Sequence, residues 1–233
     1  MPDKSARGRE RRTQSHFRRS SFDKAGRFIG ETLGTFGLPF FWPYASMRAV
    51  AELILNSADP VYRGHDIRYG DGKPVVLVPG HLGGDVTLAP LAIWLDAIGY
   101  RPVKAQVTIN LDDRALDEPL VTALRDAARR IGRKAVMIAF DTGVRAAMRV
   151  AAIEGEHVSD LIAVGLSDHL PRVPADVRLH VIETSRKVAA AWRGDIHIVD
   201  GARTLLAVNP AVLKILSEIL REIPITLLPA QQS

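Results

Sequence analysis

The sequence predicts an α/β fold in which helices cover both faces of a mostly parallel sheet, preceded by an N-terminal helical segment. Several apolar runs, such as residues 75–78 and 161–164, lack polar alternation, which is typical of strands buried on both faces of a parallel sheet. Helical stretches separate these runs, as βαβ units require. At 233 residues, 47% of them hydrophobic, the chain is long enough for one sizeable core.

The expected elements follow one another along the chain. Apolar residues at helical spacing predict a first helix over residues 45–56. Later helices are expected at 88–98, at 115–131, after Gly143, and from Pro210, a typical first-turn proline, to about Arg221. Strands are expected at 73–78, 102–109, 134–140, 160–165, 177–182 and 196–199. We divide the chain into a basic tail (1–27), a helical and aromatic segment (28–72), an α/β domain (73–223) and a C-terminal tail (224–233).

The positive charge of the chain belongs to its first 27 residues. They hold nine basic and three acidic residues, a net charge of +6, so the rest of the chain carries −1 of the total of +5. With few apolar groups, this tail is predicted to be disordered. It is either a solvated leader or an anchor to an anionic membrane surface or to nucleic acid, and the sequence leaves these alternatives open.

Residues 28–47 are apolar, but they are not predicted to cross a membrane. Glu31, Pro39 and Pro43 interrupt the stretch. Its aromatic residues either enter a membrane interface beside the basic tail or form a helical lid on the domain. The chain has no cysteine, which excludes disulfides and thiolate metal sites and fits a reducing cytoplasm. We therefore expect a cytoplasmic protein, and membrane association stays open.

A predicted strand-turn-helix at residues 134–148 carries the most specific motif of the sequence. An apolar run ends at Phe140, a short turn follows, and an alanine-rich helical stretch begins after Gly143. This is the layout of the nucleophile elbow, G-x-S-x-G, which presents a nucleophile at the mouth of an α/β sheet. Residues 139–143 read A-F-D-T-G, so Asp141 stands where the serine would be.

Four stretches between residues 74 and 220 resemble the α/β-hydrolase fold and, within it, bacterial lipase- or esterase-like proteins. They are V-L-V-P-G-H-L-G-G-D at 76–85, L-A-P-L and L-D-A-I-G-Y-R-P within 88–102, the elbow, and L-A-V-N-P-A-V at 206–212. The resemblance implies that the first stretch supplies an oxyanion-hole amide and that the last one follows the family's catalytic histidine. The candidate binding residues are therefore Gly80, His81, Leu82 and Thr142.

The chain departs from this family at the triad itself. In such relatives the acid follows a strand in a pattern like S-R-x-D-G, and the histidine lies in a pattern like G-S-H-x-G-L-x-V-N-P. Arg186 or Lys187 stands at the place of the acid here, and Arg203 at that of the histidine. The region where relatives insert a cap is reduced to residues 166–176. Because a guanidinium stays protonated, neither arginine can serve as a base, and the triad is degenerate.

These departures predict a non-catalytic protein, a pseudoenzyme that binds a partner protein or a small apolar or anionic ligand. Arg186 and Arg203 are expected either to neutralise Asp141 in an ion-pair cluster or, in addition, to grip an anionic ligand. No cofactor and no metal site are expected, because the pair His81 and Asp85 lacks a third ligand at convincing spacing.

Two other functions remain open. The first is an active hydrolase of the ester or epoxide type in which Asp141 is the nucleophile. It would need a non-standard histidine, either His169 or His81, together with Asp168. The second is an interaction protein that acts mainly through its basic and aromatic N-terminus.

Overall fold

The computed structural model describes residues 70–165, 176–185, 195–200, 206–207 and 209–228. The chain divides into two units, Met1–Met47 and Arg48–Ser233, and every described residue belongs to the second. The expected helix at 45–56, the basic tail and the reduced cap therefore lie wholly or almost wholly outside the described residues. The division of the chain into four segments stays a prediction.

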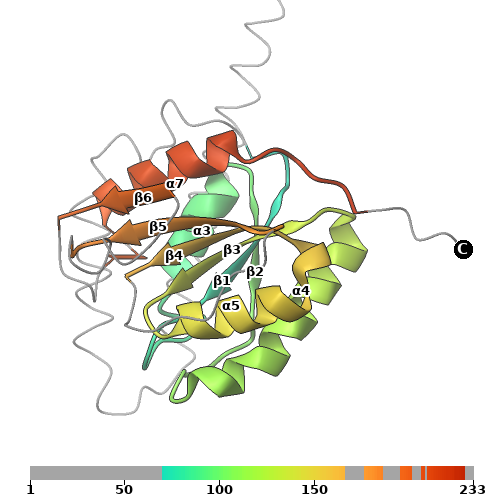
Figure 1. Ribbon diagram of the computed structural model, residues 1–233, viewed down its shortest axis with the longest axis horizontal. Coiled ribbons are helices and arrows are strands. Elements are labelled where there is room, and N and C mark those ends of the chain that lie inside the picture. The colour runs from blue at the N-terminus through green and yellow to red at the C-terminus, as the bar shows by residue number, and fades with distance from the viewer. Residues whose placement is uncertain (1–69, 166–175, 186–194, 201–205, 208, 229–233) are drawn as a thin grey trace, which may run out of the picture. The chain divides into compact units, whose positions relative to one another are not determined.

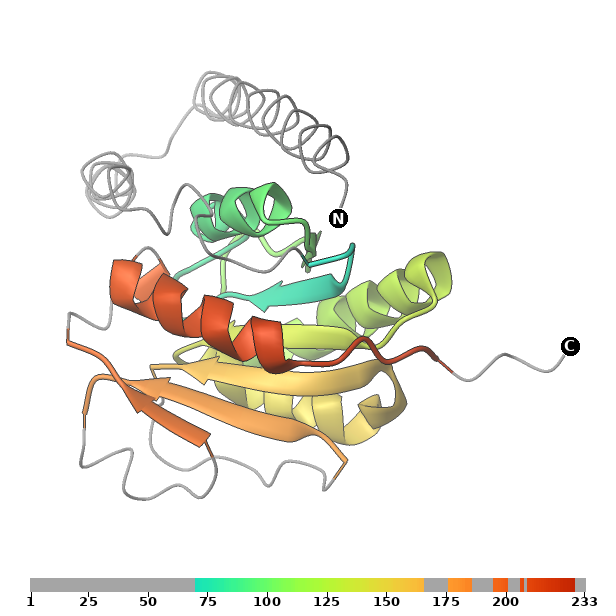
Figure 2. The same cartoon turned by 90° about the horizontal axis from the view of Figure 1, so that it is seen from above.

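The described strands form one parallel sheet of six strands, which confirms the predicted fold class. The strands are β1 (Pro74–Val78), β2 (Arg101–Lys104), β3 (Ala135–Phe140), β4 (Val158–Val164), β5 (Arg178–Glu183) and β6 (Asp195–Ile198). Their order is β2-β1-β3-β4-β5-β6, and each neighbouring pair is parallel. Figure 2 shows the strand arrows pointing the same way. Every residue of β1, β3 and β4 is buried, as expected for apolar runs without alternation.

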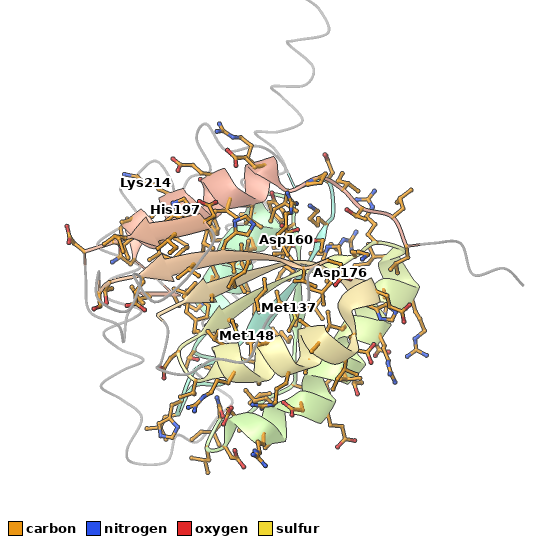
Figure 3. All side chains as sticks on the ribbon, viewed as in Figure 1. Met137, Met148, Asp160, Asp176, His197 and Lys214 are labelled. Atoms are coloured by element: carbon orange, nitrogen blue, oxygen red, sulfur yellow. The ribbon has the colours of Figure 1, made fainter. Side chains whose placement is uncertain are left out.

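Helices cover both faces of this sheet (Figure 1). Successive residues of β3 point to opposite faces, so the core has two halves. One half packs Val136 and Ile138 against α3 (Ala89–Ala97) and α7 (Pro210–Glu222). The other packs Met137 against α4 (Asp117–Ile131) and α5 (Gly143–Ile153), whose Met148 lies in the same cluster (Figure 3). Two short 3-10 helices, η1 (Asp113–Leu116) and η2 (Gly155–His157), complete the described elements.

The last helix is fixed at both ends by polar contacts. At its start the Asn209 side chain accepts a hydrogen bond from the Ala211 amide at 2.8 Å, and Pro210 occupies the first turn, as the sequence predicts. At its end Lys73, which is 2% exposed, donates to the carbonyls of Ile223 and Pro224 at 2.9 and 2.6 Å. These carbonyls would otherwise lack helical partners, so the lysine satisfies them and fastens α7 to the start of β1.

The second strand is shorter than predicted, and the segment that follows it forms part of the site. We expected a strand over 102–109, but β2 ends at Lys104. Gln106 has φ +60°, which no strand residue adopts. From there the chain bonds to another loop instead of to β1: the Asp85 amide donates to the Val107 carbonyl at 2.9 Å, and the Leu82 amide donates to the Asn110 carbonyl at 2.7 Å.

Within the described residues, no helix is long and apolar enough to cross a membrane.

Candidate functional site

The turn between β3 and α5 has the geometry of a nucleophile elbow. Asp141 follows the last residue of β3 and has φ +46°, in the left-handed region that aspartate tolerates better than most side chains. Its amide donates to the Val164 carbonyl at 2.9 Å, and its carbonyl accepts from the Val144 amide at 3.1 Å. The helix then begins at Gly143. The predicted strand-turn-helix is therefore present, with an aspartate at its apex.

The glycine loop, residues 79–84, lies directly against this elbow. A Cβ atom on Gly80 would lie 3.0 Å from the Cβ of Asp141, and one on Gly143 would lie 2.4 Å from the carbonyl oxygen of Pro79. A side chain at Gly143 would thus force backbone apart, and at Gly80 it would crowd the elbow. The two glycines explain how two segments some sixty residues apart in the sequence approach so closely.

Asn110 holds the glycine loop in place, a role that we did not predict for it. Its side-chain Nδ2 donates to the Pro79 carbonyl at 3.0 Å, and its amide donates to the Gly83 carbonyl at 2.7 Å. The residue is only 1% exposed. The sequence feature that could have predicted this role is an asparagine between the apolar residues Ile109 and Leu111. A buried polar side chain in such a place needs a hydrogen-bond partner.

Several polar groups around the elbow have no hydrogen-bond partner among the described residues. The backbone N–H groups of His81 and Thr142 donate to no backbone acceptor there. The Thr142 hydroxyl and the Asn110 Oδ1 are buried without a partner. The half-buried carboxylate of Asp141 takes part in no ion pair with a described side chain. Two free amides at an elbow are the donors that stabilise an oxyanion in hydrolases, and here they border a carboxylate instead of a hydroxyl.

Four exposed aliphatic side chains border the same loops, and we call them the apolar rim. They are Leu82 (56% exposed), Val86 (45%), Ile109 (47%) and Leu111 (65%). Leu82 and Asn110 are hydrogen-bonded neighbours, so the two leucines and the isoleucine come from adjoining segments. Leu82 also has φ +58°. The rim therefore places apolar surface beside the unpaired polar groups of the elbow.

Asp85 is the ionisable group that links the glycine loop to the segment after β2. Its burial raises the pKa of its carboxyl above the ordinary value. Hydrogen bonds from the backbone of Gln106, Val107 and Ala105 and the charge of Lys104 offset only part of this rise.

The structure assembles part of the predicted site. It places Gly80 against Asp141, with His81 and Leu82 following in the glycine loop and Thr142 next to Asp141 in the turn. Four of the other predicted residues, Arg186, Arg203, His169 and Asp168, lie outside the described residues. The ion-pair cluster and the alternative triad therefore stay predictions.

A further buried carboxylate, which we did not predict, lies at the carboxyl ends of the strands, as Asp141 does. Glu183 ends β5, is fully buried, and accepts hydrogen bonds from the amides of Thr184 at 2.7 Å and Ser185 at 3.1 Å. These bonds tie down the chain as it leaves the strand just before Arg186. A carboxylate as the last residue of an apolar strand was the signal in the sequence.

A second polar cluster lies in the amino-terminal half of β4 to β6, on the α7 face, where Figure 3 marks Asp160 and His197. Asp160 is fully buried, and its Oδ1 accepts from Arg178 Nε at 2.9 Å and lies 3.2 Å from His180 Nε2. The other ring nitrogen of His180 lies 3.3 Å from Asp195 Oδ2. We call these four residues the Asp160 cluster.

Burial works against ionisation of Asp160, but its neighbours outweigh it. Hydrogen bonds from His180 and Ser159 and the charges of Arg178 and His180 lower the pKa of Asp160 below the ordinary value. Asp160 Oδ2 and His197 Nε2 are buried without a hydrogen bond in the described part of the chain. No group of three or more acidic or histidine side chains among these residues is placed to hold a metal ion.

An open groove of about 920 Å³ lies between β2 and α4, away from the elbow. Charges of both signs line it, among them Arg101, Glu118 and Arg130, and Arg130 pairs with Asp126 at 3.3 Å. Asp71 and Gln106 in its lining have left-handed backbones, as Asp141 does, but no described lining residue has a buried side-chain atom without a hydrogen-bond partner, whereas Thr142 and Asn110 at the elbow do. We therefore place the candidate site at the elbow.

No protein-family model matches the chain, and no curated protein matches it. It is similar to a protein from Xanthomonas campestris pv. campestris assigned to the alpha/beta superfamily of hydrolases (17% identity, 65% of this chain and 98% of that chain, TM-score 0.48). It is also similar to a carboxylesterase from Mesorhizobium loti (15%, 68% and 92%, 0.49) and to the naproxen esterase of Bacillus subtilis (13%, 66% and 85%, 0.42).

At these identities and TM-scores the comparisons assign no role to any residue. The chain itself has an α/β-hydrolase-like fold, with an all-parallel described sheet, helices on both faces and an elbow between β3 and α5.

Proposed function

We propose that this protein binds a small molecule with an apolar body at the elbow and does not hydrolyse it. The observation that carries the proposal is the juxtaposition of the free amides of His81 and Thr142, the Asp141 carboxylate and the apolar rim. Free donors and acceptors fix the orientation of a ligand, and apolar surface supplies most of the favourable free energy of binding.

The absence of a hydroxyl at the apex is the reason to expect no turnover. A serine elbow needs an imidazole to accept the proton of the nucleophile. An aspartate nucleophile would need a histidine-activated water to release its ester. Among the described residues no histidine is hydrogen-bonded to Asp141, and the predicted positions of the acid and the base hold arginines.

Two measurements on the purified full chain test this function. Hydrolysis of p-nitrophenyl butyrate should be no faster than with Asp141→Ala. Binding of an apolar fluorescent probe should weaken in Leu111→Ser and stay unchanged in Leu227→Ser, a control with the same substitution at a leucine of similar exposure, 68% against 65%. Leu227 bridges to Arg133, just before β3, at the opposite end of the sheet from the elbow. Equal binding by both variants would contradict the proposed site.

The second candidate function is hydrolysis with Asp141 as the nucleophile. One observation favours it: the carboxylate lies at the apex of an elbow with φ +46° and is not tied up by any described side chain. Such an enzyme passes through a covalent intermediate on the aspartate. With an epoxide, ring opening gives an ester; with an activated ester, loss of the alcohol gives a mixed anhydride. Mass spectrometry after rapid quenching with an epoxide or an activated ester would then show an adduct on the peptide containing Asp141. An adduct together with turnover above that of Asp141→Ala would replace the binding function.

A further inference from the structure

We infer that the ligand of the elbow is an aliphatic primary amide, with a neutral amide head at Asp141 and a hydrocarbon chain along the apolar rim. This inference rests on the proposed binding function and adds the chemical class of the ligand. It follows from which polar groups at the elbow lack partners and from what the backbone strain at Leu82 implies.

The head group must both accept and donate hydrogen bonds. The unpaired N–H groups of His81 and Thr142 require an acceptor, whereas the Asp141 carboxylate accepts only. Donors and acceptor lie side by side, because the close contacts of Gly80 and Gly143 pack the two segments together. A primary amide presents one carbonyl oxygen and one NH2 group on the same planar head, which matches this pairing.

Two buried side-chain oxygens beside the elbow also lack hydrogen-bond partners in the described part of the chain. The Asn110 Oδ1 has no hydrogen bond in the described part of the chain, although its residue is 1% exposed and its Nδ2 is bonded to the glycine loop. The buried hydroxyl oxygen of Thr142 is likewise unpaired. Buried polar atoms are rarely left without partners, so both oxygens mark the elbow as a place where the described part of the chain leaves polar groups unmet.

The two obvious competitors fit less well. A fatty-acid carboxylate would bring its charge beside that of Asp141, and like charges repel strongly where water is partly excluded. An ester has a carbonyl but no N–H or O–H, so it would leave the Asp141 carboxylate desolvated without a donor. Sites built to donate and accept discriminate strongly against analogues that lack one of the partners.

The exposed and strained Leu82 indicates that the ligand has a hydrocarbon chain. A leucine at φ +58° carries strain that glycine would avoid, and at 56% exposure its side chain gains little from burial within the described fold. Strain at an exposed position persists where it serves a function. A hydrocarbon chain covering Leu82, Ile109 and Leu111 would bury the surface that the strained residue exposes.

The test compares three probes of equal chain length with the full-length protein by calorimetry: octanamide, methyl octanoate and octanoate. Octanamide should bind about tenfold more tightly than either other probe, a difference of about 1.4 kcal/mol, because the ester leaves a hydrogen bond unmet and octanoate brings a like charge. Equal or tighter binding of the ester or of octanoate would overturn the amide class and leave the binding function standing. Failure of all three to bind would instead overturn the binding function.

Two substitutions assign the effect to the elbow. Asp141→Asn keeps the shape of the side chain and suits the left-handed backbone, but it removes the charge. It should abolish most of the discrimination against octanoate. Asp71→Asn is the matched control, since Asp71 also has a left-handed backbone (φ +49°) but lies before β1, at the opposite end of that strand. Loss of discrimination in both variants, or in neither, would contradict the assignment.

Discussion

The elbow and the Asp160 cluster lie at opposite ends of the sheet's strands and treat their polar groups in opposite ways. At the elbow, two backbone amides, a hydroxyl and a carboxylate lack partners in the described chain, and leucines are exposed beside them. In the Asp160 cluster, one oxygen of a fully buried carboxylate is matched by a guanidinium and an imidazole, and only the other oxygen lacks a partner among the described residues. The pKa shifts near the two regions also differ in direction: burial raises the pKa of Asp85, next to the glycine loop, and the neighbours of Asp160 lower its pKa.

The difference separates a part of the molecule that supports the fold from one that is available for a ligand. Paired charges stabilise the native state, whereas unpaired groups and left-handed side chains cost stability and persist where they serve a purpose. Substitutions in the two regions should therefore differ in size and, for one residue, in sign.

The largest effect is expected in the Asp160 cluster. Asp160→Ala removes hydrogen bonds to charged partners and should lower the free energy of unfolding by about 2–3 kcal/mol. Asp195→Ala serves as control, because the Asp195 side chain is 55% exposed, and it should cost about 1 kcal/mol or less. Urea denaturation at neutral pH measures both. Equal losses would mean that the buried aspartate is no more important than the exposed one.

The Asp160 carboxyl should also govern stability in acid. Its pKa is lower in the folded protein than in the unfolded chain, so its contribution is present above the unfolded value of about 3.9 and is lost as the pH falls through the folded value. Denaturation midpoints of the wild type and of Asp160→Asn should therefore converge below about pH 4. A gap between them that stays constant down to pH 2 would show that Asp160 does not titrate in this way.

A substitution at Leu82 should raise the free energy of unfolding, whereas those at Asp160 and Asp195 should lower it. Leu82→Gly relieves a left-handed side chain and should raise the free energy of unfolding by about 1 kcal/mol. Ile109→Gly, at another exposed rim residue (47% against 56%) but one without a positive φ, should lower it instead. Both variants should bind apolar ligands less well. If Leu82→Gly destabilises the fold, the leucine is supported by packing outside the described residues.

Asp141→Ala should have a smaller effect on stability. A half-buried carboxylate without a described partner is expected to contribute about 1 kcal/mol or less. A loss of about 3–5 kcal/mol in chemical denaturation would instead indicate the buried ion-pair cluster with Arg186 and Arg203, because breaking such a pair costs that much. The measurement therefore separates an available carboxylate from a neutralised one.

The smallest effect concerns Asp85 and has the opposite pH dependence to Asp160. Because the pKa of Asp85 is raised in the folded state, the native protein holds its proton longer than the unfolded chain does. Its contribution is therefore largest below the unfolded value and declines as the pH rises through the folded value. The stability difference between wild type and Asp85→Asn should fall as the pH rises from 3 to 7, and a rise would contradict the assigned shift.

The sequence by itself determined the parallel sheet, the elbow and the glycine loop. Apolar runs without alternation identify strands that are buried on both faces of the sheet. Asn209 and Pro210 predict the start of the last helix. Glycines at 80 and 143 mark positions where two backbones meet. Each of these features depends on a pattern in a few consecutive residues, so it can be predicted without knowing the contacts between distant segments.

Only the tertiary structure decided where β2 ends, how the rim forms and which charges pair. The bond from Asn110 to Pro79 joins residues 31 apart in the sequence, and the contacts of His180 with Asp160 and Asp195 join residues 20 and 15 apart. Apolar residues at 107 and 109 fit a strand equally well by pattern. The chain leaves the strand there because backbone groups of residues 82–85 bond to Val107 and Asn110, and a hydrogen-bond partner distant in sequence leaves no periodic pattern in the chain.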